Sequence, residues 1–413
     1  MRSLYLPSLL VLALLLVVTA TVGQPPSGGW TQWGGPTQDF RAASTGLAAS
    51  WPEAGPRKLW TRELGEGYSA ILVDSGRLYT MYRDGDQEAV ACLNSKTGET
   101  VWEHKYAAAP HESHVQQFGD GPRSTPLISG DMLYTIGVAG KIHGLNKKDG
   151  TVVWSHDLWN DFGGNPLNHG YSSSPIAYKN TVIVPVGGEG QSLVAFDKKD
   201  GHVVWKQHSF KNSYSTPKVV DVGGRDELIV FMAKQLIGID PTSGDLRWEY
   251  PIENQWGQNI SMPVMVDGTL LLSSLQAGSR GLKLTRDGDK TALEEVWSTR
   301  KIQFYHVATA RDGDYVYGST GNGPAFMTAI NIKTGEIAWR KRGFAKANCL
   351  YADGKLIILD EDGMLYLTTA NPEDLTVHSQ VELLDKVSWT VPTLVGKTLY
   401  VRDKSSILAL DLG

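Results

Sequence analysis

Cysteine and runs of like charge are scarce in this sequence. Cys92 and Cys349 are the only cysteines among 413 residues, and both lie inside apolar strand patterns. We therefore predict two buried thiols and no disulfide framework. The net charge is −5, and no block of basic residues is present. This charge pattern gives no support for nucleic acid or an anionic membrane as a partner.

A membrane-spanning run is also lacking. The apolar run Leu9–Val18 is shorter than the roughly 18 residues that a transmembrane helix requires. Arg2 precedes it and small residues follow up to Gly23, which predicts a secretory signal peptide over residues 1–23. Loss of Arg2 would take the net charge from −5 to −6. No cysteine stands near this site, so we expect no lipid anchor there and a periplasmic or secreted protein without a transmembrane segment.

The sequence does contain an internal repeat. An apolar strand ending in Asn or Asp is followed by a Thr-Gly or Asp-Gly turn and then by a short strand with Trp, as in 93–102, 145–154 and 196–205. Further copies span 239–248, 284–297 and 330–339. The tryptophans lie 42 to 52 residues apart, a spacing typical of propeller blades. They are Trp60, Trp102, Trp154, Trp205, Trp248, Trp297 and Trp339.

Each repeat has four short apolar runs separated by turn residues. In the second repeat they are 125–128, 132–137, 141–146 and 151–156, with Gly, Asn or Asp in the turns. Four strands joined in this way form one antiparallel blade. Strands such as 356–359 are apolar on both faces, which is typical of a sheet stacked between two others. The sequence therefore predicts an all-β, eight-bladed β-propeller with the tryptophans as packing residues.

The two ends of the repeat region complement each other. The eighth copy ends with a third strand at 407–411, whereas 58–60 resembles a fourth strand with nothing before it. We predict that the N-terminal strand completes the last blade, because this removes two open edges. The seventh copy has Thr376 and Val377 in place of the tryptophan. Residues 24–57 would form an extension packed on one face of the 58–413 propeller, anchored by Trp30, Trp33 and Trp51.

The candidate site lies where the inner strands begin. Loops from a fourth strand to the next first strand open on one face of a propeller, and they are long at 105–122 and 158–170. Eight residues start the inner strands, three positions before a Pro or its equivalent, or four in the cases of Tyr171 and Asn259. They are Tyr68, Arg123, Tyr171, Tyr214, Asn259, His306, Lys346 and Trp389. Such a ring could hold an anionic, planar or carbohydrate-like ligand, or could merely bond neighbouring blades.

Other polar motifs are assigned to turns, and we expect no metal ligand. The string Arg-Asp-Gly-Asp at 83–86, 286–289 and 311–314 lacks the distal Glu of a calcium loop and suits hairpins. His111, Glu112 and His114 stand on a loop with no helix to align them for zinc. Residues 187–190 lack the context of a phosphate loop. No nucleophile elbow is recognisable.

The blade motif resembles the repeats of pyrroloquinoline quinone (PQQ) dehydrogenases and of BamB-type outer-membrane assembly propellers. It is most similar to exported PQQ-like repeat proteins of bacteria, over nearly the whole mature chain. The resemblance is also carried by Trp30-Thr31-Gln32-Trp33-Gly34-Gly35-Pro36 and Gly121-Pro122-Arg123-Ser124-Thr125-Pro126. Alcohol-oxidising quinoproteins carry adjacent cysteines and hold Ca²⁺ with Glu, Asn and Asp. This chain has no Cys-Cys pair, and no catalytic Asp can be assigned by motif.

Three functions follow as expectations. The first is an exported, monomeric and non-catalytic scaffold that holds a cell-envelope protein or a small ligand at the funnel mouth. The alternative is a PQQ- and Ca²⁺-dependent dehydrogenase that oxidises an alcohol or a sugar. The third is a lyase or hydrolase acting on polysaccharide, for which the aromatic funnel is the sole support.

Overall fold

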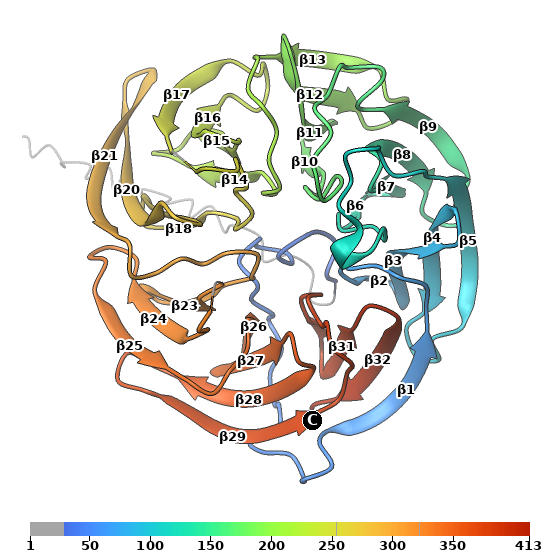
Figure 1. The fold of residues 1–413 in the computed structure, drawn as a ribbon, viewed down its shortest axis with the longest axis vertical. Coiled ribbons are helices and arrows are strands. Elements are labelled where there is room, and N and C mark those ends of the chain that lie inside the picture. Colours follow the sequence, from blue (N-terminus) through green and yellow to red (C-terminus); the bar gives the residue numbers. More distant parts are fainter. Residues whose placement is uncertain (1–28, 253, 322) are drawn as a thin grey trace, which may run out of the picture.

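Eight antiparallel sheets surround a central axis in the computed structural model (Figure 1). It describes residues 29–413 except 253 and 322, so the predicted signal peptide lies outside the described residues. In this part of the chain, 32 strands form eight sheets of four, and the helical element is a single 3₁₀ turn, η1 (Gln116–Phe118). The prediction of an all-β, eight-bladed propeller is confirmed.

The first four blades follow the chain without crossovers. Blade 1 holds β2 (Leu72–Asp74), β3 (Arg77–Asp84), β4 (Gln87–Asn94) and β5 (Thr100–Ala107). Blade 2 holds β6 (Leu127–Ser129), β7 (Met132–Ile136), β8 (Lys141–Asn146) and β9 (Val152–Asp157). Blade 3 holds β10 (Ile176–Tyr178), β11 (Thr181–Gly188), β12 (Gln191–Asp197) and β13 (Val203–Gln207). Blade 4 holds β14 (Lys218–Asp221), β15 (Asp226–Phe231), β16 (Gln235–Ile239) and β17 (Leu246–Pro251).

The last four blades repeat this order, except at the closure. Blade 5 holds β18 (Val264–Val266), β19 (Thr269–Ser274), β20 (Gly278–Asp287) and β21 (Lys290–Thr299). Blade 6 holds β22 (Ala310–Asp312), β23 (Tyr315–Ser319), β24 (Met327–Asn331) and β25 (Ile337–Lys341). Blade 7 holds β26 (Ala347–Ala352), β27 (Lys355–Asp360), β28 (Met364–Ala370) and β29 (Leu375–Glu382). Blade 8 holds β30 (Thr393–Val395), β31 (Thr398–Arg402), β32 (Ser406–Asp411) and β1 (Arg57–Glu63).

Both chain ends contribute to blade 8, as predicted. β1 pairs antiparallel with β32, with Trp60 opposite Ala409, and the two strands lie side by side in Figure 1. Arg402, fully buried, then joins this blade to the first. Its guanidinium donates hydrogen bonds to the Thr80 hydroxyl at 3.0 Å and to the carbonyls of Gly65, Ser69 and Met81. The closure therefore combines a strand ladder with a buried charged group.

The repeated tryptophans pack each blade on the next one. Trp102 donates its indole N–H to the Lys147 carbonyl at 3.2 Å, across the seam to the turn of blade 2. Gly150 in that turn has a φ of +77°, and a Cβ there would lie 2.5 Å from the Trp102 ring. The positive φ and the close approach of the Trp102 ring both require glycine at position 150. Four more pairs share this arrangement: Trp60 with Gly98, Trp154 with Gly201, Trp205 with Gly244, and Trp297 with Gly335.

Hydroxyl groups link the inner strands, which are not paired with one another in a ladder. The Thr125 N–H donates to Ser174 Oγ, and the Ser174 N–H donates to Thr216 Oγ1, both at 3.0 Å. At the closure, Thr393 Oγ1 donates to the Ile71 carbonyl at 2.7 Å. These bonds satisfy buried backbone groups and fix where each inner strand stands around the axis.

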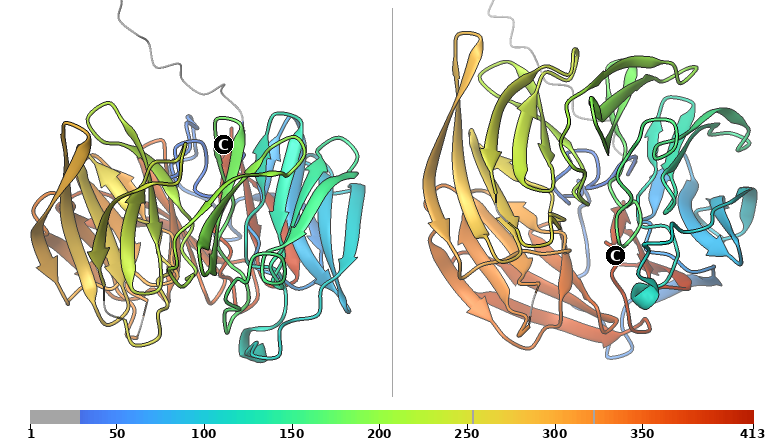
Figure 2. Two further views of the ribbon diagram at one scale, coloured as in Figure 1. Left: turned by 90° about the horizontal axis from the view of Figure 1, so that it is seen from above. Right: turned by 45° about the horizontal axis from the view of Figure 1, so that its top comes forward.

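The extension at 29–56 crosses the face of the disc that carries the hairpins between first and second strands. Trp30 exchanges backbone hydrogen bonds with Val73, and Ala42 donates to the Tyr351 carbonyl at 2.9 Å. Lys218, buried, donates its Nζ to the Gln38 carbonyl at 2.7 Å. Figure 2 shows the extension (blue) on one face and η1 (teal) on the opposite face. The sequence left this choice of face open.

The structure also bears on the cysteines and on membrane-spanning helices. Cys92 and Cys349 are buried and not disulfide-bonded to each other. In residues 29–413, apart from 253 and 322, no helix is long and apolar enough to cross a membrane.

Candidate functional site

A cavity of about 580 Å³ lies on the propeller axis. Trp33, Gln38, Asp39 and Phe40 of the extension form one end, and residues from the fourth-to-first loops form the other. Six of the eight residues predicted to ring the mouth line this cavity. They are Tyr68, Arg123, Tyr214, His306, Lys346 and Trp389.

Tyr171 and Asn259 do not line the cavity, so the prediction that they stand in the ring is wrong. Tyr171 is fully buried and donates its hydroxyl to the Pro185 carbonyl at 2.8 Å. Asn259, also fully buried, donates its amide to the Met232 carbonyl at 2.8 Å. Both stand four positions before a proline, whereas the other six stand three positions before a proline or its equivalent. Because side chains alternate along extended backbone, this difference reverses their direction, and Ser172 and Ile260 line the cavity instead.

Trp389 is the centre of the aromatic contacts at the mouth. Its ring centroid lies 5.0 Å from that of Phe118, 5.3 Å from His306 and 5.5 Å from Tyr68. The Lys346 ammonium lies 5.1 Å from the same ring. This distance is within the range of a cation–π interaction. The contacts join the segments that lead into the first strands of blades 1, 6, 7 and 8, together with η1.

The two cations at the mouth differ in their partners. Lys346 forms an ion pair with Glu361 at 3.1 Å, and Glu361 also accepts the Trp389 indole N–H at 2.9 Å. Arg123 forms no ion pair within the described part of the chain. Its guanidinium donates to the Gly119 and Gly121 carbonyls and lies 5.7 Å from the Tyr68 ring. Burial lowers the pKa of Arg123 from its ordinary value, but a guanidinium remains charged in proteins.

His306 is a neutral acceptor in this cluster. Burial, and secondarily the charge of Lys346, lower the pKa of His306 to about 3. The Lys346 ammonium, which can only donate, lies 3.3 Å from His306 Nε2. Nε2 is therefore the acceptor, and the ring proton sits on Nδ1. His306 has a φ of +41°, a left-handed backbone conformation that turns the chain at the start of the inner strand.

Several lining residues were missed by the sequence reasoning. Phe118 and His169 come from the two long loops, and their rings lie 5.7 Å apart. Tyr305 precedes His306 and donates its hydroxyl to Gln258 at 2.7 Å. Trp256, 57% exposed, also borders the cavity. The lengths of the loops at 105–122 and 158–170 indicated that this face carries the site. No local sequence pattern shows which residues of these loops fold over the axis.

The polar motifs lie at the turns that the sequence predicted. Residues 83–86, 286–289 and 311–314 connect β3 to β4, β20 to β21 and β22 to β23, and residues 187–190 connect β11 to β12. His111 Nδ1 lies 2.9 Å from Ser113 Oγ, and His114 Nε2 lies 3.2 Å from Asp120. Among the described residues, these histidines belong to no group of three metal-ligating side chains.

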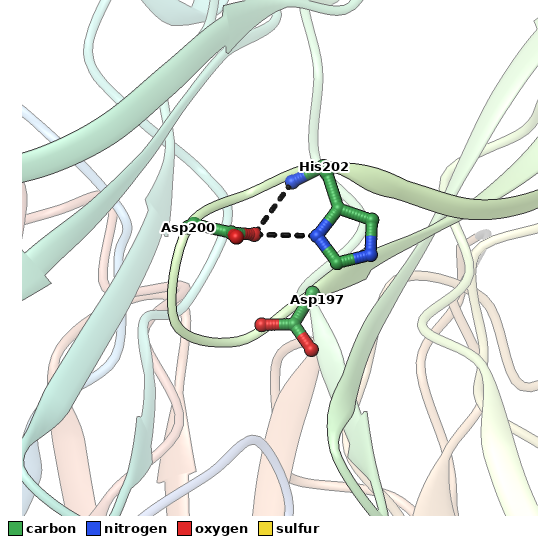
Figure 3. A group of neighbouring side chains, drawn as sticks. All are labelled: Asp197, Asp200 and His202. Atoms are coloured by element: carbon green, nitrogen blue, oxygen red, sulfur yellow. Dashed lines mark hydrogen bonds and ion pairs between the residues drawn. The ribbon is translucent and has the colours of Figure 1, made fainter.

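Asp197, Asp200 and His202 do form such a group, on the turn between β12 and β13 (Figure 3). Their positions are explained by the repeat. Asp197 accepts the Lys199 N–H at 2.8 Å, and Asp200 accepts the His202 N–H at 3.1 Å. In the first blade, Asn94 stands in the place of Asp197 and accepts the Lys96 N–H at 2.9 Å. The group is therefore one copy of a turn that also forms with a neutral amide.

The lining does not fit a calcium–quinone pair. Ca²⁺ takes six to eight oxygen ligands, with carboxylates among them. Asp39 is the one carboxylate among the described lining residues, and its oxygens are bonded to Thr37 and, at 3.0 Å, to Arg311. Asn348 accepts the Ala308 N–H at 2.8 Å and donates to the Trp389 carbonyl at 2.9 Å. What this arrangement offers is stacking and positive charge.

Comparison with known proteins places this fold in a family. The model described as outer membrane protein assembly factor BamB matches residues 46–224 and 86–341. BamB of Salmonella typhimurium is 24% identical over 295 residues, covering 68% of this chain and 72% of that protein. Quinoprotein alcohol dehydrogenase PedH of Pseudomonas putida is 25% identical over 245 residues, covering 53% of this chain and 38% of that protein.

Solved structures agree on the architecture. Quinohemoprotein alcohol dehydrogenase from Comamonas testosteroni superposes with a TM-score of 0.62 at 10% identity, covering 94% of this chain and 81% of that chain. An identity this low concerns the fold alone.

Proposed function

Because the chain belongs to the family of outer membrane protein assembly factor BamB, we propose that it is a non-catalytic scaffold of the cell envelope. Residues 1–23 would direct its export, and the mature protein would work in the periplasm. Its partner would be another envelope protein, held on the face that carries the fourth-to-first loops. The family relationship is what chiefly supports this proposal.

The character of the loop face supports the same conclusion. Trp256 is 57% exposed beside the cavity, and Val115 on the loop after β5 is 39% exposed. Exposed apolar groups next to Trp, Tyr and Arg side chains are typical of binding surfaces. The opposite face is covered at its centre by the extension, as Figure 2 shows. A partner would therefore meet the aromatic cluster only from the loop side.

The dehydrogenase alternative has similarity to PedH in its favour and the chemistry of the lining against it. Asp39, the one carboxylate among the lining residues that the structure describes, is engaged by Arg311 and Thr37. We expect that added PQQ and Ca²⁺ do not bind saturably to the purified protein. Saturable binding with alcohol-dependent dye reduction would replace the scaffold by a dehydrogenase.

Photo-crosslinking in living cells tests the scaffold proposal. A photoreactive residue would replace Trp256 on the loop face in one variant and Val377 in another. Val377, 42% exposed on β29, is a matched control because it is apolar, exposed and on the outer rim. We expect a specific adduct with an envelope protein from position 256 and none from position 377. Adducts from position 377 alone, or from neither position, would contradict the proposal.

A further inference from the structure

The central cavity has apolar surface at its closed end. The chain leading into blade 5 contributes Gln258, Ile260, Ser261, Met262 and Val264 to the lining. Met262 marks the closed end, because a Cβ on Gly34 of the extension would lie 3.3 Å from its Cε. Met262 therefore supplies apolar surface at the closed end, next to the extension.

The walls contributed by other blades are mixed in character. Ser174, Thr216 and Asn348 are polar, whereas Ala308 and Val391 are apolar. Trp33 and Phe40 of the extension complete the closed end, with ring centroids 5.2 Å apart in an edge-on arrangement. We call the apolar surface of Met262, Val391, Trp33 and Phe40 the chamber, and the ring of Arg123, Lys346, His306 and Trp389 at the mouth the collar.

Cations stand at both ends of the cavity. Arg123 and Lys346 line the mouth, and Arg311 and Lys218 bond to the extension residues at the closed end. Carboxylates stand nearby as well: Glu361 pairs with Lys346, Asp39 pairs with Arg311, and the charges of Glu66 and Asp120 act on Arg123. Of the two cations that line the mouth, Arg123 is the one without an ion pair among the described residues.

The Arg123 guanidinium has more N–H donors than the two hydrogen bonds it forms within the described part of the chain. Of the five N–H donors of a guanidinium, one from each terminal nitrogen goes to the Gly121 and Gly119 carbonyls. Those bonds hold the planar group beside Tyr68 and leave the other donors for a ligand. Guanidinium groups bind carboxylates in charge-assisted pairs, often with two parallel bonds.

We propose that this cavity binds a carboxylate joined to an apolar body. The carboxylate would pair with Arg123 at the collar, and the apolar body would occupy the chamber lined by Met262, Val391 and Phe40. The cavity volume of about 580 Å³ is within the usual range of ligand sites. Two sources supply this chemistry: a free long-chain acid, or an apolar C-terminal residue of a protein partner. The second source rests on the proposed scaffold function, and the first does not.

Matched ligands test the proposal on the full mature chain. Dodecanoate and its uncharged counterpart dodecan-1-ol would be titrated calorimetrically below their aggregation limits. A short peptide ending in Phe would be titrated with a free carboxylate and with an amidated end. We expect the charged member of at least one pair to bind about 10- to 100-fold more tightly than its neutral counterpart, as for a hydrogen-bonded charge.

Variants assign the effect to the collar. Arg123→Gln should weaken binding of the charged ligand to the level of the neutral one. Arg57→Gln should leave it unchanged, because Arg57 lies on the outer strand β1 with its side chain 73% exposed. Comparison of the matched ligands on the unaltered protein keeps the test decisive if Arg123→Gln does not fold.

The titrations with dodecanoate and with the peptide acid identify the source of the carboxylate. Tight binding of dodecanoate alone assigns a free acid, tight binding of the peptide acid alone assigns a chain end, and binding of both shows that either source is accepted. Neutral ligands that bind as tightly as charged ones, no binding by either acid, or a folded Arg123→Gln variant with unchanged affinity would overturn the proposal. The crosslinking result at position 256 is independent of these titrations, so the scaffold function and the ligand assignment can fail separately.

Discussion

Replacing His143 by phenylalanine should make the protein less sensitive to acid. His143 lies on β8 at the seam between blades 1 and 2, is 7% exposed, and has an Nδ1 without a hydrogen-bond partner among the described residues. Its ring centroid lies 4.3 Å from that of Tyr106 and 5.4 Å from that of His104. Phenylalanine would keep these ring contacts and remove the titrating group.

The magnitude follows from the pKa of His143. Burial, followed by the charges of His104 and Lys141, lowers this pKa from the ordinary 6.5 to about 3. As the pH falls below 6.5, the unfolded chain binds a proton at this position and the folded chain does not, so stability decreases until the pH approaches 3. Between about pH 7.5 and pH 5.5, this single group should cost about 1.4 kcal/mol of unfolding free energy.

The other titratable groups facing this seam remain in the variant. They include His104, whose pKa is lowered by burial, and Glu88, whose pKa is raised by burial. The measured quantity is therefore the difference between the two proteins in the unfolding free energy lost on acidification. The groups that both proteins share contribute nearly equally to each loss and largely cancel in this difference.

Denaturant unfolding of both proteins at the two pH values measures this change. The His143→Phe variant should lose about 1.4 kcal/mol less than the parent on acidification. Ile142→Val is the control, since it removes a methylene from a fully buried neighbour on the same strand. It should cost about 0.5–1.5 kcal/mol equally at both pH values. An identical pH dependence for His143→Phe and the parent would refute the assignment of a neutral buried imidazole.

Two further predictions concern the seams of the ring. Arg402→Met should cost at least about 3 kcal/mol, because it removes a donor from three buried acceptors, on Ser69, Thr80 and Met81, and from the half-buried Gly65 carbonyl. Arg57→Met, which breaks an exposed ion pair with Asp411, should cost under about 1 kcal/mol; equal denaturation midpoints would contradict the buried closure. Gly150→Ala should destabilise more than Gly130→Ala, because both have positive φ but only Gly150 faces a tryptophan ring. Equal losses in thermal unfolding would show that Trp102 does not constrain this turn.

The repeat predicted the fold because each copy specifies its own blade. The turn glycines, the outer-strand tryptophans and the apolar inner strands are local features of the sequence. The closure could be predicted as well, since β32 needs a neighbour and β1 offers one. Arg402 could not be found in this way, because its acceptors lie more than three hundred positions away in the chain.

The candidate site was only partly predictable, because a count that is off by one residue along a strand selects a side chain that faces away from the cavity. Counting back from the prolines or their equivalents placed Tyr68 and Arg123 at the cavity, where the structure has them. Counting one residue further back selected Tyr171 and Asn259, whose side chains are buried in the core. The alternation of extended backbone would have favoured Ser172 and Ile260 at those places. The lining contributed by Phe40 and Phe118 depends on how the extension and a long loop fold over the axis. That arrangement is set by contacts between distant parts of the chain and not by local pattern.

Cysteine accessibility tests the central claim that the cavity is open at the loop face and closed by the extension. Cys92 and Cys349 are buried, so single cysteines at Trp256 and Met262 can be followed separately. With a polyethylene glycol maleimide, Trp256→Cys should be labelled quickly and Met262→Cys should not be labelled in the folded protein, although a small thiosulfonate should reach both. Labelling of Met262→Cys by the large reagent as fast as Trp256→Cys would show that the far end is open, which would contradict the account.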